Sequence, residues 1–294
     1  MHILCLLGHI ASSRQLEARG VDARALRSAV ADGSILRLRR GTYACPHLDA
    51  AIARAAALGG ALTCVSLLAQ AGVWAGPRLG PERPLHLQVP PTASGTLARA
   101  DEHLHWEKPR FGMSTPWRVT SKQALWQAMR CLDEEHAIAA MESAIHEGFL
   151  TEREVRMLGR LAPRRLEDGI RRLVPNSGSG NETITRLRLE RVGYRVEAQG
   201  NVPGMGHEDL VVEDCVGLEV DSHAWHEGED HYILDRDRDI HVAGLGRPVI
   251  RLRPAYITQT WPQTLSVIDR VVADALRERR RRTGRLLVGY HDAL

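Results

Sequence analysis

Two apolar segments in the carboxyl-terminal third of the chain carry acidic side chains at spacings that suit a cation site. Asp209 lies in the first segment, residues 207–212, and Glu219 and Asp221 lie in the second, residues 216–221. Because side chains alternate between the two faces of a strand, Glu219 and Asp221 share one face. Crowded carboxylates repel one another unless a cation lies among them, and oxygen ligands without a thiolate suit Mg²⁺ or Mn²⁺ better than Zn²⁺. We therefore predict that Asp209, Glu219 and Asp221 bind Mg²⁺ or Mn²⁺.

A histidine and a run of alternating aspartate and arginine follow these acids. His226 comes soon after Asp221, and Asp235 opens the run that ends at Asp239. A histidine near a metal-bound water can act as a general base, and a carboxylate that binds its far nitrogen fixes its tautomer. We assign His226 as the base and Asp235 as its orienting partner. Two alternatives stay open, since Asp221 can instead shape the turn after its strand and His226 can pack against Trp225.

The elements that must position these residues begin after residues 176–180, Asn-Ser-Gly-Ser-Gly, which are typical of a linker. A hairpin across a turn at 213–215 would place Asp209 beside Glu219 at one end of a sheet. Three antiparallel strands, extended by a fourth after a crossover helix, predict an α/β sandwich of modest size. The predicted elements are a helix at 182–191, strands at 194–198, 208–212 and 216–221, a helix at 229–242, a strand at 248–252 and a helix at 262–276.

At the other end of the chain, residues 1–47 have the pattern of a helix-turn-helix followed by a β-hairpin wing. Ser12 or Ser13 can cap a first helix, and Asp22 can cap a second. Residues 35–43 then alternate between apolar and basic side chains like a hairpin. The pattern predicts a small winged helix-turn-helix.

Arginine side chains mark both the second helix and the wing of this segment. In a regular hairpin, Arg37 and Arg39 fall on one side of the strand. The second helix of such a motif meets the major groove of DNA, and wing arginines meet phosphates. The alternative is a small helical cap whose charges are solvated. The arginines predicted to contact DNA are Arg24, Arg27, Arg37, Arg39 and Arg40.

The wing sequence at residues 36–43, Leu-Arg-Leu-Arg-Arg-Gly-Thr-Tyr, resembles that of AbiEi-type antitoxins. The resemblance covers the winged helix and the segment that follows it. It implies a protein that binds DNA and represses its own operon.

Residues 48–175 form a middle, AbiEi-like domain of alanine-rich helices and short strands. His86, His103 and His105 are assigned as ordinary strand residues, since no further ligand follows at a spacing typical of zinc sites. We expect this domain to serve positioning or partner contact and no chemistry. Its predicted elements are strands at 85–89 and 103–107, helices at 122–129 and 134–145, and a helix opened by a capping box at 151–154.

The carboxyl-terminal module, residues 181–294, resembles the very-short-patch-repair (Vsr) endonucleases, which have the restriction-endonuclease-like fold. The resemblance covers about residues 179–275 and rests on Glu182, Asp209, Glu219-Val220-Asp221, Trp225-His226, Asp235-Arg236 and residues 246–251.

This resemblance implies that Asp209 binds magnesium and that His226 activates water while Asp235 hydrogen-bonds it. Glu182 on the first helix would complete the site, although a carboxylate there can also simply interact with the helix dipole. Two features depart from the family. Asp221 stands where many restriction-type sites have lysine and Vsr enzymes have histidine, and the structural zinc ligands of Vsr are missing.

Charge and cysteine content indicate the partner and the compartment. The net charge is +3, the only lysines are Lys108 and Lys122, and arginine is densest at 37–40 and 277–285, which suggests a polyanionic partner rather than a membrane. The five cysteines are widely scattered without a Cys-x-x-Cys pair, as in proteins of a reducing cytoplasm. No stretch approaches the ~20 apolar residues of a membrane helix, so we expect a cytoplasmic protein without a membrane span.

These features predict a DNA-binding, divalent-metal-dependent endonuclease that hydrolyses phosphodiester bonds, with Asp209 and Glu219 holding the metal. Trp225, Arg236 and Arg238 are added to the predicted DNA-contacting residues. The alternative is an antitoxin-like transcriptional regulator whose nuclease-like domain does not cut, because a fold alone does not decide function. The set of acids with a histidine favours the enzyme, and the missing lysine opposes it.

Overall fold

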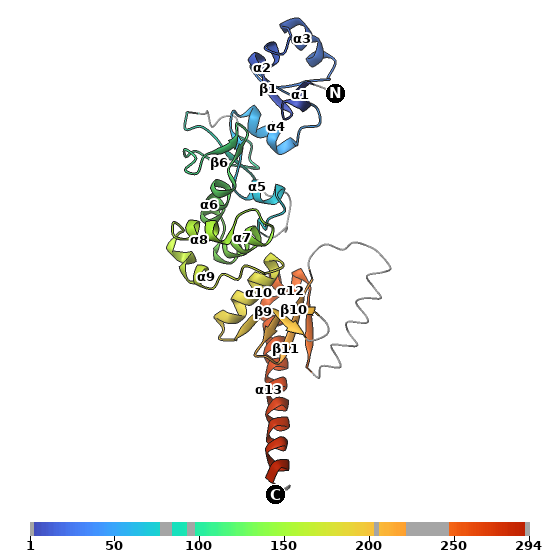
Figure 1. Cartoon of the computed structure of the whole chain (residues 1–294), viewed down its shortest axis with the longest axis vertical. Helices are drawn as coiled ribbons and strands as arrows, with labels where there is room; N and C mark the ends of the chain where they lie inside the picture. Colours follow the sequence, from blue (N-terminus) through green and yellow to red (C-terminus); the bar gives the residue numbers. More distant parts are fainter. Residues whose placement is uncertain (1–2, 77–83, 93–97, 203–205, 222–246, 292–294) are drawn as a thin grey trace. The chain divides into compact units, whose positions relative to one another are not determined.

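The computed structural model combines helices with several β-sheets and describes residues 3–76, 84–92, 98–202, 206–221 and 247–291 (Figure 1). Contacts divide the chain into two compact units, residues 1–131 and 132–294. The predicted domain limits, at 47/48 and around 176–180, stay predictions. Among the helices of the described segments, none has both the length and the hydropathy needed to cross a bilayer.

The first unit begins with a winged helix-turn-helix, as the sequence predicts. Ser12 forms a capping box with Gln15, and the Asp22 carboxylate accepts a hydrogen bond of 2.7 Å from the Ala25 amide. A helix and a strand that the sequence pattern did not predict precede this motif. The elements are α1 (Ile3–Leu6), β1 (Ile10–Ser12), α2 (Ser13–Glu17), α3 (Ala23–Ala31), β2 (Leu36–Arg39) and β3 (Thr42–Ala44), with strand order β1-β3-β2.

A small apolar core holds these elements together. Leu16 of α2 and Leu26 of α3 pack with Leu4, Ala11 and other buried residues between the helices and the sheet. Burying each large aliphatic side chain contributes about 1.5–3 kcal/mol, so this core fixes α3 against the wing.

The rest of the first unit contains a five-stranded sheet with order β6-β5-β4-β8-β7. Strands β5 and β6 run parallel, and α5 packs against α6. The predicted strands at 85–89 and 103–107 and the helix at 122–129 are confirmed. The elements are α4 (Ala50–Ala57), β4 (Ala61–Leu62), α5 (Cys64–Gln70), β5 (Leu85–Gln88), β6 (Glu102–His105), β7 (Met113–Thr115), β8 (Arg118–Val119) and α6 (Ser121–Cys131).

The second unit opens with a group of helices in which α7 packs against α10. The capping box predicted at Thr151 and Glu154 is present at the start of α8. The segment predicted as a linker lies against α10, where Ser177 is buried and its hydroxyl lies 2.9 Å from that of Thr183. The elements are α7 (Glu134–His146), α8 (Glu152–Gly159), η2 (Arg164–Leu166), α9 (Glu167–Arg171) and α10 (Gly180–Arg191).

A four-stranded sheet of order β12-β11-β10-β9 follows. β9, β10 and β11 are antiparallel neighbours, as the sequence predicts, and the predicted fourth strand, β12, pairs with β11 in parallel. The crossover helix predicted at 229–242 lies outside the described residues. The elements are β9 (Val196–Val202), β10 (Gly206–Val212), β11 (Val216–Val220), β12 (Val249–Leu252), α12 (Pro254–Thr258) and α13 (Trp261–His291).

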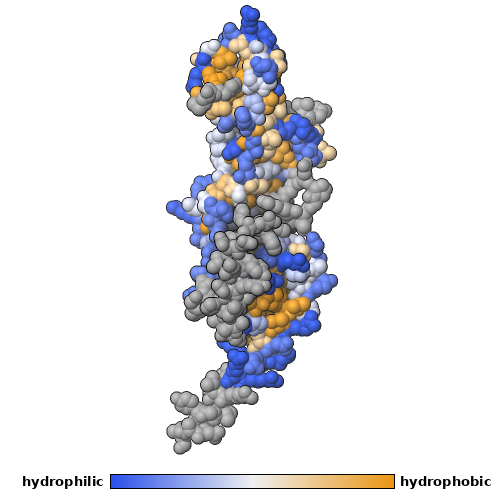
Figure 2. Space-filling view, turned by 90° about the vertical axis from the view of Figure 1, so that its right-hand side faces the viewer, coloured by the Kyte–Doolittle hydropathy of each residue, from blue (hydrophilic) through white to orange (hydrophobic). Residues whose placement is uncertain are grey.

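Helix α13 is longer than the predicted helix at 262–276. Ile268 and Val272 are buried, whereas the residues from Arg277 to Arg282 are exposed. Figure 2 shows this exposed part of the helix as a hydrophilic surface next to the grey atoms at the bottom of the view. Within this arginine run, Arg282 forms an ion pair with Glu278 one helical turn before it. The arginine run therefore continues a regular helix.

Candidate acidic site and candidate nucleic-acid interface

The acids predicted on β10 and β11 lie on neighbouring strands. Leu210 and Leu218 are register partners in the antiparallel pair, so Asp209 and Glu219 are the next positions opposite each other. The Asp209 carboxylate accepts a hydrogen bond of 2.7 Å from the Val220 amide, which ties it to β11. Residues opposite each other in a sheet share a face. The structure therefore brings Asp209 and Glu219 together, as the hairpin predicted.

Glu182 joins this pair from the first turn of α10. Its side chain is almost completely buried, and its carboxylate accepts hydrogen bonds of 2.9 Å from the Gly178 amide and from the Gln199 side chain. Burial raises the pKa of Glu182 to about 7, and the nearby charge of Asp209 adds to the rise. Two carboxylates that repel each other in this way form a site that favours a cation or a shared proton.

The remaining predicted residues of the acidic site are Asp221, which the structure describes, and His226 and Asp235, which it does not. Asp221 follows β11, and its backbone amide donates a 3.0 Å hydrogen bond to the Leu252 carbonyl. The predicted base and its partner, with the predicted DNA-contacting residues of the same segment, lie outside the described residues. These are His226, Asp235, Trp225, Arg236 and Arg238.

Sequence reasoning missed two residues beside the acids. Gln199 has a left-handed backbone, with φ of 53°, and its amide holds the Glu182 carboxylate. Arg251 on β12 is the register partner of Glu219 on β11. The strand next to β11 therefore carries a guanidinium group at the level of Glu219. Arg251 lies in the segment that resembles Vsr enzymes, and the parallel pairing of β11 with β12 places it beside Glu219.

Glu208, next to Asp209 in the sequence, is a buried structural acid. Its carboxylate forms an ion pair with Arg247. A Cβ added at Gly217 would lie 2.6 Å from this carboxylate, so the absence of a side chain at position 217 leaves room for the acid. Glu208 is therefore held by its own partner.

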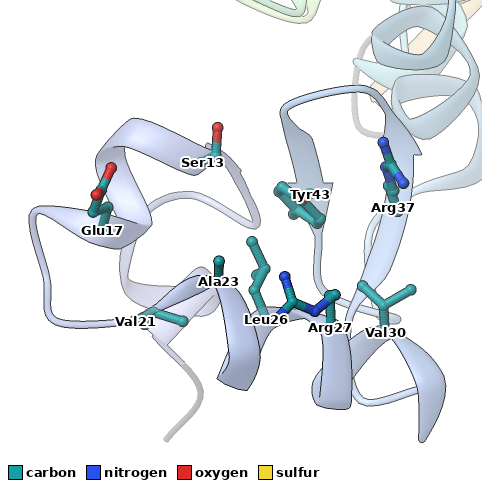
Figure 3. Close-up of a pocket in the computed structure, with 9 residues that line it drawn as sticks. All are labelled: Ser13, Glu17, Val21, Ala23, Leu26, Arg27, Val30, Arg37 and Tyr43. Carbon is teal, nitrogen blue, oxygen red and sulfur yellow. The ribbon is translucent and has the colours of Figure 1, made fainter.

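The winged helix places the predicted DNA-contacting arginines on its surface. Arg24 and Arg27 on α3 and Arg37, Arg39 and Arg40 in the wing are all exposed. A cavity of about 300 Å³ lies between α2, α3 and the wing, and Arg27 and Arg37 both line it (Figure 3). The recognition helix and the wing therefore present positive charge to a common surface.

The wing corrects one expectation, because Arg37 and Arg39 do not share a face. A bulge shifts the register so that Arg37 pairs with Tyr43 and Arg39 pairs with Thr42, and adjacent residues of β3 face opposite sides. The Arg39 guanidinium instead lies against the chain after α4, where a Cβ added at Gly59 would be 2.6 Å from it. Arg37 is thus the wing arginine that faces α3.

Comparison with known families finds a match in the winged-helix segment. Residues 7–46 match the family model described as transcriptional regulator, AbiEi antitoxin. The AbiEi-like resemblance of the amino-terminal region is therefore confirmed for these residues, and the Vsr-like resemblance of residues 179–275 stays a prediction. No curated protein matches the chain.

Proposed function

We propose that this protein binds duplex DNA through its winged helix-turn-helix, with α3 in the major groove and Arg37 of the wing on the phosphates. The observation that carries the proposal is the cavity between α3 and the wing, which Arg27 and Arg37 both line, with the exposed Arg24 on the same helix. Recognition helices of this motif contact base edges, and flanking arginines contact the backbone. The match of residues 7–46 to an antitoxin regulator supports the same role.

The salt dependence of binding to a fluorescein-labelled duplex tests this role. The slope of log affinity against log salt is about −0.9 for each phosphate neutralised. We expect Arg37→Ala to weaken binding and to make the slope shallower by about 0.9, the value for one phosphate contact. The matched control is Arg153→Ala on α8, whose side chain is exposed. Equal affinities and slopes for the two variants would reject the proposed interface.

We further propose that the second unit is a divalent-metal-dependent endonuclease. The supporting observation is the buried Glu182 carboxylate, whose pKa is raised to about 7 by burial and by Asp209. Glu182, Asp209 and Glu219 together offer only oxygen atoms as ligands. Such a set fits Mg²⁺ or Mn²⁺. A bound metal ion would polarise the phosphate and lower the pKa of a water molecule.

The residues of the chain would divide the remaining tasks. Gln199 and the Gly178 amide hold Glu182 in place. His226 would take the proton from water, and Asp235 would orient the imidazole of His226. Arg251, beside Glu219 in the sheet, would supply the positive charge that a lysine provides in many restriction-type sites. The missing lysine is then no argument against cutting.

Cleavage of supercoiled plasmid in Mg²⁺ tests the enzyme proposal. Wild type should nick or cut the plasmid, and Asp209→Ala and His226→Ala should not. Glu147→Gln, which changes an exposed carboxylate on another element, is the control and should cut like wild type. Equal cutting by all four proteins would indicate a contaminating nuclease.

A transcriptional regulator that binds DNA without cutting is the second candidate, and the antitoxin match of residues 7–46 favours it. The two candidates share DNA binding and differ only in phosphodiester hydrolysis. If wild type binds duplex DNA with the expected salt slope but cuts none of several plasmid and linear substrates in Mg²⁺ or Mn²⁺, the regulator is the correct function.

A further inference from the structure

We propose that Cys64, His86, His105 and Cys131 form a structural Zn²⁺ site in the first unit. One ligand atom from each of these four residues lies within 4.8 Å of all the others. The site shares no residue with the acidic site or the winged helix, and it does not depend on the proposed function.

The geometry of the two histidines is close to that of zinc ligands. The His86 Nδ1 and His105 Nε2 atoms are 3.1 Å apart. Zinc binds imidazole nitrogen at about 2.0–2.1 Å, so two such nitrogens at tetrahedral angles are roughly 3.3 Å apart. The two nitrogens therefore already lie at about the separation that a shared zinc ion requires.

The fold gathers the four residues from four different elements. β5 and β6 pair in parallel with His86 opposite His103 and with Gln88 opposite His105, which puts the histidines of both strands on one face. Cys64 is the first residue of α5 and Cys131 the last residue of α6, and α5 packs against α6. The sheet supplies the nitrogens and the helix ends supply the sulfurs.

Cys64 is held in an unfavourable backbone conformation. It has a φ of 51°, in the left-handed region, and its side chain is fully buried. Such conformations cost of order 1–3 kcal/mol for residues other than glycine and persist where the surrounding structure determines them. Next to it, the Thr63 amide donates a hydrogen bond of 3.3 Å to the His86 carbonyl. This contact fixes the cysteine beside the histidine strand.

The donor set identifies the metal and its role. Two thiolates with two imidazoles are typical of zinc, and four protein ligands leave no open position for substrate, so the site is structural rather than catalytic. Cys64, His86 and His105 are buried, whereas Cys131 is exposed and gives an entry route for the ion. Each thiol loses one proton when the ion binds.

Polar side chains around the four residues support this arrangement. The His103 ring stacks on His86 with centroids 4.6 Å apart. Behind the histidines, the Gln127 amide donates a 2.8 Å hydrogen bond to Gln88, and the Gln88 amide donates one of the same length to the His105 carbonyl. These hydrogen bonds hold the β6 backbone that carries His105.

Metal content of the full-length chain, purified in a reductant that does not bind zinc, tests the site. We expect Cys64→Ser and Cys131→Ser to hold about one equivalent of zinc less than wild type. The matched control is Cys215→Ser, a buried cysteine of the second unit, which should keep the wild-type content. Comparing variants in this way also separates the site from the smaller group of Cys5, His9 and Cys45.

Cobalt replacement gives a second measurement, which begins with the wild-type chain. Metal-free wild type titrated with Co²⁺ should develop thiolate charge-transfer and tetrahedral visible bands, and Zn²⁺ should abolish them. The proposal is overturned if these bands do not appear, or if a folded Cys64→Ser variant gives the wild-type spectrum. It is equally overturned if mass spectrometry finds Cys64 and Cys131 joined in a disulfide in zinc-free protein isolated under reducing conditions.

Discussion

At the scale of single residues, the second unit depends on a charge pair that is completely removed from solvent. Glu142 of α7 and Arg186 of α10 are 0% and 1% exposed, and their closest atoms are 2.6 Å apart. The Glu142 carboxylate also accepts hydrogen bonds from the Val174 amide and the Thr183 hydroxyl, each 2.7 Å long. The pair therefore ties α7, α10 and the chain before α10 together.

We predict that Arg186→Met lowers the free energy of unfolding of the second unit by about 3–5 kcal/mol, because it leaves the Glu142 carboxylate buried without its countercharge. Urea denaturation monitored by circular dichroism measures the change. Arg171→Met, which removes an exposed ion pair with Glu167 on α9, should cost less than about 1 kcal/mol. A similar small cost for both variants would contradict the prediction.

The raised pKa of Glu182 leads to a prediction about how stability depends on pH. Its pKa in the folded chain, about 7, is above the ordinary value of 4.5, so the folded state binds the proton more tightly than the unfolded state. In metal-free protein, stability should therefore fall as pH rises from about 4.5 to about 7, by roughly 3 kcal/mol in total. Glu182→Gln should remove this dependence.

Urea denaturation in a chelator at pH 5 and pH 8 measures this effect. Glu147→Gln, at an exposed position of the same unit, should keep the wild-type pH dependence. Added Mg²⁺ should stabilise wild type more at pH 8 than at pH 5, since the cation competes with the proton for the carboxylate. A Glu182→Gln variant that loses stability with pH as wild type does would refute the assignment.

The residues that could be predicted from the sequence are those whose neighbours are close along the chain. Asp209 and Glu219 flank one hairpin, so the period of a strand and the length of the turn were enough to pair them. Arg251 could not be paired with Glu219, because that contact depends on a parallel strand after a long crossover. A zinc site at His86 and His105 cannot be predicted from sequence spacing for the same reason, since both cysteines of the cluster come from the ends of helices far away in the sequence.

At the scale of elements, the wing shows how one bulged residue changes an interface. The bulge between Arg37 and Arg39 turns Arg37 toward Tyr43 and α3, and it turns Arg39 toward Gly59. We predict that Arg37→Ala lowers the affinity for duplex DNA and the salt slope, whereas Arg39→Ala changes the salt slope by much less. Fluorescence anisotropy titrations at several salt concentrations compare the two variants. Equal losses of slope would show that both arginines contact phosphate.

Elements with strong local signals were predicted, and elements that depend on distant contacts were not. The caps at Ser12, Asp22 and Thr151 are local, because each side chain binds an amide three residues ahead. By contrast, β1 is short and is defined by its pairing with β3. A one-residue bulge such as that of the wing leaves no trace in an alternating pattern of leucine and arginine.

At the scale of the whole molecule, the two compact units carry different chemistry. The first contains the winged helix and the Cys64, His86, His105 and Cys131 cluster, and the second contains the acidic site and the buried Glu142–Arg186 pair. Each unit has its own buried residues, and each proposed metal site uses ligands from within one unit. Because a ligand that binds only the folded state stabilises the structure that it binds, each metal ion is expected to stabilise the unit that supplies its ligands.

We therefore predict two thermal transitions that respond to different changes, each recorded by calorimetry of the full-length chain. In buffer without Mg²⁺ or Mn²⁺, removing zinc with a chelator should lower only the transition of residues 1–131, because the proposed zinc ligands all belong to that unit. Arg186→Met should lower only the other transition, by roughly 10 °C, since about 2–4 °C corresponds to 1 kcal/mol in a unit of this size. A single transition that moves with both changes would show that the units unfold together.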